Sequence, residues 1–221
     1  MLLRKLRELI KLALGQGRTG FSSAAYWEAR YSGGGNSGDG SYGHLAAFKA
    51  GVINEHVARH GIKSVIEFGC GDGNQLKLAE YAQYVGYDVS SAAVRRCRGM
   101  FGSDRSKSFH LAGEYDGQTA DLAISIDVIF HLVEDSVYDE YMRRLFQAAR
   151  DHVIIYSSNE EKSAERESRH VRHRHVTAWI DREMSPTWTL EREVPNPFPF
   201  DGDNATGSFA NFYIYRRSTG K

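Results

Sequence analysis

The stretch "SVIEFGCGDG" (residues 64–73) joins a short apolar run to a turn that is rich in glycine. Residues 63–68 have the composition of a buried strand, and we expect a helix from about Asn74 to Tyr81. A glycine-rich turn between a strand and a helix is where α/β folds bind nucleosides and nucleotides. The turn carries its glycines at three alternate positions, Gly69, Gly71 and Gly73.

The alternation of strand and helix continues along the chain, which indicates a mostly parallel α/β sheet with helices on both faces. The end of the chain differs, because two late strands are separated by a loop without a helix. Two successive strands joined in this way pair antiparallel. We expect the later strands at 84–89, 107–112, 120–126, 152–158, 187–194 and 208–217, and helices at 90–101 and 136–150.

Composition excludes several classes of protein. The 221 residues carry 28 basic and 28 acidic side chains, and this balance argues against a general nucleic-acid binder. The two cysteines, Cys70 and Cys97, are too few for a disulfide scaffold or a zinc module. We find no signal peptide and no apolar run of membrane-spanning length. A reduced, cytoplasmic setting is therefore expected.

Residues 2–14 alternate apolar and basic side chains at helical spacing and predict an amphipathic helix. Such a helix can lie on an anionic membrane, here the inner face, or pack against its own domain or a partner. The second interpretation is the more common one. We assign residues 1–50 to this helix and the glycine-rich segment that follows, and residues 51–221 to the main domain.

Two acids flank the glycine turn in a way that selects among cofactors. Asp88 ends the second expected strand, nineteen residues after Gly69, where a carboxylate can accept both ribose hydroxyls. Glu67 precedes Gly69 by two, so the pattern is E-x-G-x-G-x-G and not the G-x-G-x-x-G of pyrophosphate binders. A carboxylate at this place suits a cofactor with an amine and a sulfonium. The same spacing disfavours an NAD-linked oxidoreductase.

These features together resemble class I S-adenosylmethionine-dependent methyltransferases over about residues 50–217. The resemblance implies a Rossmann-like fold with a seven-stranded, mostly parallel sheet, helices on both faces and an antiparallel C-terminal hairpin. It implies S-adenosylmethionine as cofactor and Asp88 as the ribose acid. It also places Glu114 and Tyr115 around the adenine, and Asp127 and His131 at the exit of the fourth strand, "ADLAISIDVIFHLVED" (residues 120–135).

A second glycine-rich stretch, "YWEARYSGGGNSGDGSYG" (residues 26–43), follows no strand and lacks a G-K-[ST] ending, so it is not a phosphate loop. Its glycines allow hinge conformations and its aromatics can close on a ligand, which favours a lid over a disordered linker. We expect Trp27 to contact the cofactor, and Tyr31 and Tyr42 to contact the substrate.

The methyl acceptor is either a hydroxyl, which benefits from a general base, or an anionic oxygen, which needs cations to hold it. His131 is the expected base, with Asp127 beside it in the catalytic site. Residues 169–175 form a basic cluster that we expect to bind an anionic acceptor rather than a metal, because no cysteine or carboxylate lies at ligand spacing. Its members are Arg169, His170, Arg172, His173, Arg174 and His175.

The segments "YWEARY", "EFGCGDGNQL" and "SFANFYIYRR" resemble bacterial methyltransferases of surface-polysaccharide and capsule biosynthesis. This implies O-methylation of a sugar hydroxyl or a phosphoryl-type group on a small molecule or a glycan precursor. Two alternatives stay open. One is a cofactor-binding subunit without catalysis that serves a partner, and the other is a methyltransferase acting on another small metabolite.

Overall fold

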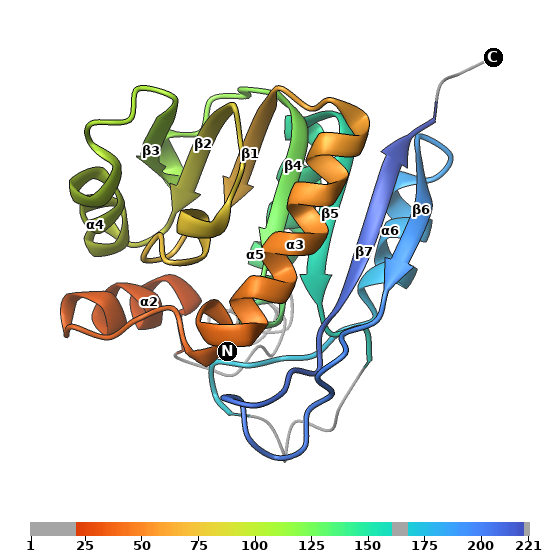
Figure 1. Ribbon diagram of the computed structural model, residues 1–221. Helices are drawn as coiled ribbons and strands as arrows, with labels where there is room; N and C mark the ends of the chain where they lie inside the picture. Colours follow the sequence, from red (N-terminus) through yellow and green to blue (C-terminus); the bar gives the residue numbers. More distant parts are fainter. Residues whose placement is uncertain (1–20, 161–167, 219–221) are drawn as a thin grey trace, which may run out of the picture.

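The computed structural model describes residues 21–160 and 168–218, and its centre is a seven-stranded sheet with the order β3-β2-β1-β4-β5-β7-β6 (Figure 1). The expected helix at residues 2–14 lies outside the described residues. The strands are β1 (Ser64–Phe68), β2 (Gln83–Asp88), β3 (Lys107–Leu111), β4 (Ala120–Ile126), β5 (Ala149–Ser157), β6 (Trp188–Val194) and β7 (Asn211–Arg217).

The strand directions confirm the predicted topology. Neighbouring pairs from β3 through β2, β1 and β4 to β5 are parallel, and β7 pairs antiparallel with both β5 and β6. In β6 the pairing register shifts between Leu190 and Arg192, which is a β-bulge. The carboxyl ends of the parallel strands therefore meet at one edge of the sheet, where ligands of α/β folds bind.

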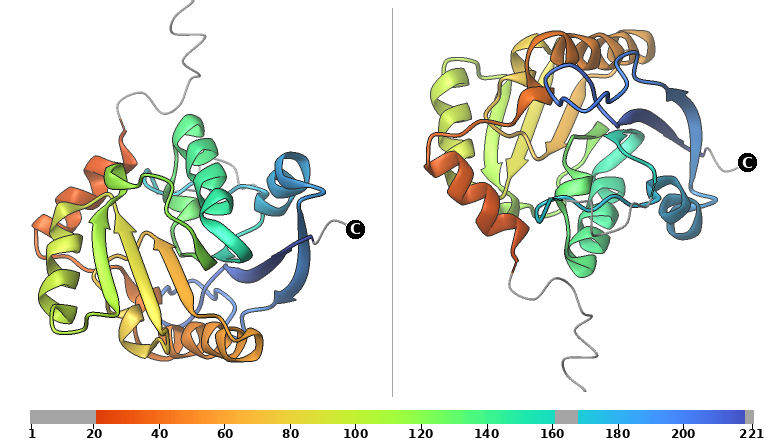
Figure 2. Two further views of the ribbon diagram at one scale, coloured as in Figure 1. Left: turned by 90° about the horizontal axis from the view of Figure 1, so that it is seen from above. Right: turned by 90° about the horizontal axis from the view of Figure 1, so that it is seen from below.

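Helices cover both faces of the sheet, as Figures 1 and 2 show. On one face, α3 (Gly43–His60) and α4 (Ser91–Phe101) pack into a core with Val65 and Ile124. On the other face, α5 (Asp135–Ala148) and α6 (Val176–Met184) pack against Ile66 and Val153. Neither α3 nor α6 was predicted, and α3 continues across the expected domain boundary at residue 50. None of the described helices is long and apolar enough to cross a membrane.

The prediction of a helix from about Asn74 to Tyr81 is wrong, because only a short 3₁₀ turn, η2 (Gln75–Leu78), forms there. Leu76 is the one buried residue of this turn. It joins the core that α3 already fills, so this face of the sheet is covered without a longer helix. The connection between β1 and β2 is correspondingly short.

The segment before α3 lies across the carboxyl edge of the sheet. Its helix α2 (Ser23–Ser32) begins after Ser22, whose side chain accepts the N–H of Ala25 at 3.3 Å. Tyr31 packs against α4 through Ala92 and Ala93. The glycine-rich residues then pass through the short turn η1 (Asp39–Ser41) into α3. The predicted lid is thus placed beside the glycine turn after β1 (Figure 1).

Candidate active site

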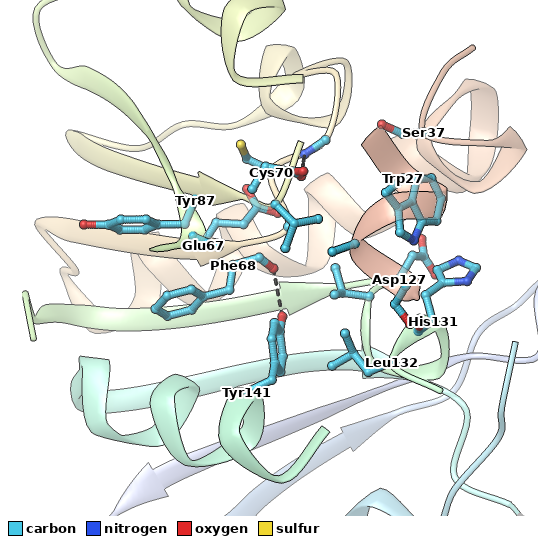
Figure 3. Close-up of a pocket in the computed structure, with 18 of the residues that line it drawn as sticks. Trp27, Ser37, Glu67, Phe68, Cys70, Tyr87, Asp127, His131, Leu132 and Tyr141 are labelled. Carbon is cyan, nitrogen blue, oxygen red and sulfur yellow. Dashed lines mark hydrogen bonds between the residues drawn. The ribbon is translucent and has the colours of Figure 1, made fainter. Parts of the chain in front are cut away.

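A cavity of about 280 Å³ opens at the carboxyl ends of β1, β2 and β4, between the segment containing α2 and the start of α5 (Figure 3). The strand order reverses between β1 and β4, so the cavity lies at the topological switch point of the sheet. Eight predicted site residues line it: Trp27, Tyr31, Glu67, Gly69, Gly71, Asp88, Asp127 and His131.

The glycine turn after β1 requires glycine for two separate reasons. Gly69 and Gly71 have φ of +89° and +57°, which side-chain-bearing residues rarely adopt. A Cβ on Gly69 would overlap Val128 Cγ2, and one on Gly71 would overlap Ser37 Oγ. Gly73 (φ +78°) does not line the cavity, and its Cβ would press on Cys97 Sγ. Gly73 packs the turn against α4, and its contact with the cofactor stays a prediction.

Asp88 lies at the end of β2, buried at the wall of the cavity. One carboxylate oxygen accepts the N–H of Gly71 at 2.9 Å, and the other accepts the N–H of Ser90 at 2.8 Å. Burial raises the pKa of Asp88 to about 6 against the opposing effect of these hydrogen bonds. The carboxylate thus fixes the glycine turn and stands where the resemblance places a ribose acid.

Glu67 lines the same end of the cavity and is only 6% exposed. The hydroxyl of Tyr84 donates to its Oε2 at 2.5 Å. Burial raises the pKa of Glu67 to about 7, although this hydrogen bond and the charge of Lys49 act in the opposite direction. A carboxyl poised near neutrality can ionise when a cationic group arrives beside it.

Glu114 and Tyr115, which were predicted to surround the adenine, do not line the cavity. Glu114 turns back on its own short turn and accepts the N–H of Leu111 at 2.8 Å. The ring of Tyr115 packs edge-on against Phe68 and Tyr87 from behind. The cavity wall here consists of Phe68, Tyr87, Val89 and Ala112, an apolar and aromatic surface that suits a purine ring.

The glycine-rich segment is tied to the turn after β1 through Asp72, which the sequence analysis missed. The N–H of Ser37 and the hydroxyl of Tyr42 both donate to Asp72 Oδ2, at 3.0 and 2.8 Å. Tyr31 lies over Gly71, with its hydroxyl 3.0 Å from Ser37 Oγ. Tyr31 therefore belongs to the glycine-turn end of the cavity, and Tyr42 fastens the segment without lining the cavity. The contact of both tyrosines with the substrate stays a prediction.

Asp127 follows β4 with a φ of +58°, a strained conformation for a residue other than glycine. Its Oδ2 forms an ion pair with Lys49 of α3, a lysine that is 1% exposed. A carboxylate held in such a pair is a poor base, so the structure does not support Asp127 as the proton acceptor. Lys49 was also missed, and its signal in the sequence is a cation on the apolar face of a helix.

His131 lies beside Trp27, whose ring it meets edge-on with 4.8 Å between ring centroids (Figure 3). Its Nδ1 is 2.9 Å from the carbonyl oxygen of His170. A carbonyl oxygen only accepts, so Nδ1 carries the proton and Nε2 keeps a lone pair. Burial lowers the pKa of His131 to about 4, which leaves the ring neutral near pH 7.

The basic cluster of residues 169–175 does not present an anion site to the cavity, and none of its six predicted residues lines it. Arg172 and Arg174 both pair with Asp135, at 2.9 and 2.6 Å. His173 is buried with its Nδ1 2.7 Å from Ser158 Oγ. Asp135 comes from the start of α5, far from the cluster in sequence, so this pairing could not be predicted; acceptor binding by the cluster stays a prediction.

The remaining members of the cluster lie around this loop. The ring of His170 stacks on Tyr26 with 4.6 Å between centroids, and its carbonyl orients His131. His175 is exposed at the start of α6. The cluster therefore supports the loop that carries His131.

The start of α2 is fastened to that same loop by Ser23 and Glu134. The N–H of Ser23 donates to Glu134 Oε1 at 2.9 Å, and the Ser23 hydroxyl oxygen lies 2.5 Å from Glu134 Oε2. The same hydroxyl oxygen lies 2.7 Å from the carbonyl oxygen of His131. All three residues line the cavity, so α2 and His131 are held together at its far end.

Several solved structures share this fold. The N-methyltransferase NodS from Bradyrhizobium japonicum WM9, in complex with S-adenosyl-L-homocysteine, superposes with a TM-score of 0.68 at 14% identity, covering 90% of this chain and all of that one. Magnesium protoporphyrin IX methyltransferase from Synechocystis PCC 6803 with bound S-adenosylmethionine gives 0.62 at 14% identity, covering 91% and 100%. The methyltransferase domain of bacterial CtHen1-C gives 0.59 at 21% identity, covering 77% and 97%.

No curated protein matches the sequence significantly. The family described as "Methyltransferase domain" does match, over residues 30–192, which include the glycine turn, Asp88, Asp127 and His131. This match and the cavity at the switch point of the sheet agree with each other. The chain belongs to the methyltransferase-domain family.

Proposed function

We propose that this protein is an S-adenosylmethionine-dependent O-methyltransferase that methylates a neutral hydroxyl of a polar small molecule. The observation that carries the proposal is the fixed tautomer of His131, whose Nε2 keeps its lone pair at the wall of the cavity. A hydroxyl on a glycan precursor, as in surface-polysaccharide biosynthesis, is the acceptor class that the sequence resemblance implies.

The residues around the glycine turn fit S-adenosylmethionine, and two of the similar structures hold it or its demethylated product. Asp88 would bind the ribose hydroxyls, and Glu67 would face the cationic amine. Phe68 and Tyr87 provide the apolar wall for the adenine. When bound, the cofactor supplies a methyl group on a sulfonium. The chain contributes alignment of the two reactants and exclusion of water.

His131 can take the proton that a hydroxyl must lose when its oxygen accepts a methyl group. Its Nδ1 proton is held by the carbonyl of His170, so the incoming proton goes to Nε2. Trp27 meets this ring edge-on, and Leu132 also lines the cavity (Figure 3). The base is therefore fixed in both orientation and protonation state before the acceptor enters.

The charges of the cavity favour a neutral acceptor over an anionic one. Among the described lining residues, Arg144 is the single arginine or lysine. Its guanidinium donates to Glu140 at 2.7 Å and to the carbonyl of Ala112 at 3.0 Å. Lys49, just behind the wall, pairs with Asp127. A phosphoryl or carboxylate group in this cavity would meet acidic side chains. Among the described residues that line the cavity, no lysine or arginine lacks an acidic partner, which argues against the anionic acceptor.

The test compares His131→Gln with His110→Gln, a matched exchange at a half-buried position outside the cavity. Labelled methyl transfer is measured from S-adenosylmethionine to a panel of sugar nucleotides, other hydroxyl compounds, amines and an RNA oligonucleotide. We expect transfer to a hydroxyl compound and a fall of about 10²- to 10⁴-fold in His131→Gln alone. Calorimetry should show equal S-adenosylhomocysteine affinity in both variants.

Three results would contradict the proposal. Full activity of His131→Gln would show that His131 is not the base. Transfer to amines or RNA would show that the acceptor is not a hydroxyl. Binding of S-adenosylhomocysteine without transfer to any compound would favour the non-catalytic subunit. Because the pKa of His131 is about 4, the rate should be flat near neutral pH and fall in acid below about pH 5. An unperturbed histidine would instead give a rise between about pH 6 and 7.

A further inference from the structure

Three histidines and a glutamate meet at the end of the sheet opposite the cavity. His56 and His60 are one helical turn apart on α3, His152 lies near the start of β5, and Glu191 lies at the bulge of β6. His56 and His152 are 2% and 6% exposed, whereas the side chain of Glu191 is 32% exposed. Four residues from three elements thus converge on one place.

The distances within this cluster are short. His56 Nε2 lies 3.2 Å from His152 Nδ1. Glu191 Oε2 lies 3.8 Å from His152 Nδ1, and Glu191 Oε1 lies 4.0 Å from His60 Nε2. The His60 ring is centred 4.3 Å from that of His56 and 4.7 Å from that of His152. Nitrogen atoms of His56 and His152 and the carboxylate of Glu191 therefore lie close together, and the His60 ring lies beside them.

This geometry is close to that of a tetrahedral metal site. Ligands at the Zn–N distance of about 2.0–2.1 Å in a tetrahedron are about 3.3 Å apart. The two buried histidines already match this spacing, and ligand atoms of His56, His152 and Glu191 all lie within 4.8 Å of one another. His60 and Glu191, which are partly exposed, have room to move inward by rotation of their side chains.

We propose that His56, His60, His152 and Glu191 form a binding site for a divalent transition metal, of which Zn²⁺ fits the ligand set best. Imidazole suits Zn²⁺, Cu²⁺ and Ni²⁺, and four protein ligands without an open position are typical of structural zinc sites. Cu²⁺ binds such ligands more strongly in general, so selectivity depends on the tetrahedral geometry. The ion would link helix α3 to β6, the strand at the edge of the sheet.

The protonation and charge of the surroundings are compatible with a cation. The hydrogen bond between His56 and His152 uses one N–H, and that ring must move its proton to its other nitrogen to bind a metal. Of the nearby arginines, Arg59 and Arg192 both pair with Glu55.

The test uses the full chain without a histidine tag, stripped of metal with EDTA. Zn²⁺ is titrated by calorimetry, and Co²⁺ binding is followed by visible absorption, which is strong for tetrahedral cobalt. We expect one equivalent of Zn²⁺ to bind. The affinity should fall by at least about tenfold in His60→Ala and in Glu191→Gln, two variants chosen because these side chains are partly exposed. His152→Ala should abolish binding.

The control is His175→Ala, which removes an exposed histidine from the histidine-rich segment at 170–175. Zn²⁺ affinity in this variant should equal that of the unmodified chain. The proposal is overturned if no equivalent of Zn²⁺ binds, or if His175→Ala weakens binding while His60→Ala and Glu191→Gln do not. S-adenosylhomocysteine affinity should be unchanged in all four variants, so this outcome is independent of the methyl-transfer experiment.

Discussion

Glu67 is a buried carboxyl with a pKa of about 7, and we expect this pKa to make cofactor binding dependent on pH. A cationic amine beside it favours the ionised form, so below pH 7 the carboxyl must lose a proton when the ligand binds. We expect S-adenosylhomocysteine affinity to fall by about tenfold from pH 8 to pH 6. Calorimetry at both values, in buffers of different ionisation enthalpy, would also measure the released proton.

Glu67→Gln is the control for this effect. It keeps the size of the side chain, so binding at pH 8 should weaken and the fall toward pH 6 should largely disappear. We assign the pH dependence of binding that remains in Glu67→Gln to Asp88, whose pKa is about 6. An unmodified chain with the same affinity at both pH values would mean that Glu67 does not face the amine.

Single residues were predictable where strand and turn spacing alone places them. Glu67 and Asp88 are such residues, because each lies at a fixed distance from the glycine turn. The role of Arg174 was not predictable, since its partner Asp135 is 39 positions away in sequence. The same holds for Tyr42, which lies 30 positions from Asp72. Such pairings depend on the folded chain and leave no local pattern.

At the scale of elements, the glycine-rich segment and the turn after β1 fit together only because Gly71 has no side chain. In Gly71→Ala the new Cβ would overlap Ser37 Oγ and lie 3.0 Å from the Tyr31 hydroxyl. We expect the segment to detach, which hydrogen exchange of residues 31–42 would show as lost protection. S-adenosylhomocysteine binding should weaken, and the ligand should no longer restore protection.

Gly61→Ala separates this effect from backbone strain. Gly61 has a φ of +61°, close to the +57° of Gly71, but a Cβ there meets nothing within 4 Å. Both variants should lose about 1–2 kcal/mol of unfolding free energy from the left-handed conformation. Only Gly71→Ala should change the exchange of residues 31–42. Equal exchange in the two variants would mean that the segment is not held through this contact.

Helix α3 carries two buried polar residues whose roles were not predicted from the sequence. Its buried face consists of Leu45, Ala46, Val52, Ile53 and Val57 together with two polar residues, Lys49 and His56. A polar side chain on such a face needs a partner. Lys49 forms an ion pair with Asp127 at the active site. His56, which lies about 10 Å further along the helix, forms a hydrogen bond with His152. A prediction of helix α3 from the sequence would therefore have indicated both the candidate active site and the proposed metal site.

At the scale of the whole molecule, the mostly parallel seven-stranded sheet was predictable because strands and helices alternate clearly along the chain, and the final hairpin was predictable because its two strands have no helix between them. The N-terminal part of the fold was not, since glycines and aromatics conceal the start of α3. The basic cluster was read as an acceptor site because its charges were counted without Asp135. The seven strands follow from local composition, whereas the site depends on which distant residues the sheet brings together.

The bulge in β6 has a consequence for solubility. Among the described strands β6 ends the sheet, and an open strand edge invites pairing with another molecule. The bulge between Leu190 and Arg192 interrupts its regular backbone, and charged Arg192 and Glu193 follow. We expect Arg192→Thr with Glu193→Val to aggregate at concentrations where the same exchanges on helices, Arg95→Thr with Glu140→Val, leave the scattered light unchanged. We therefore expect the irregular strand to keep the protein dispersed in a crowded solution.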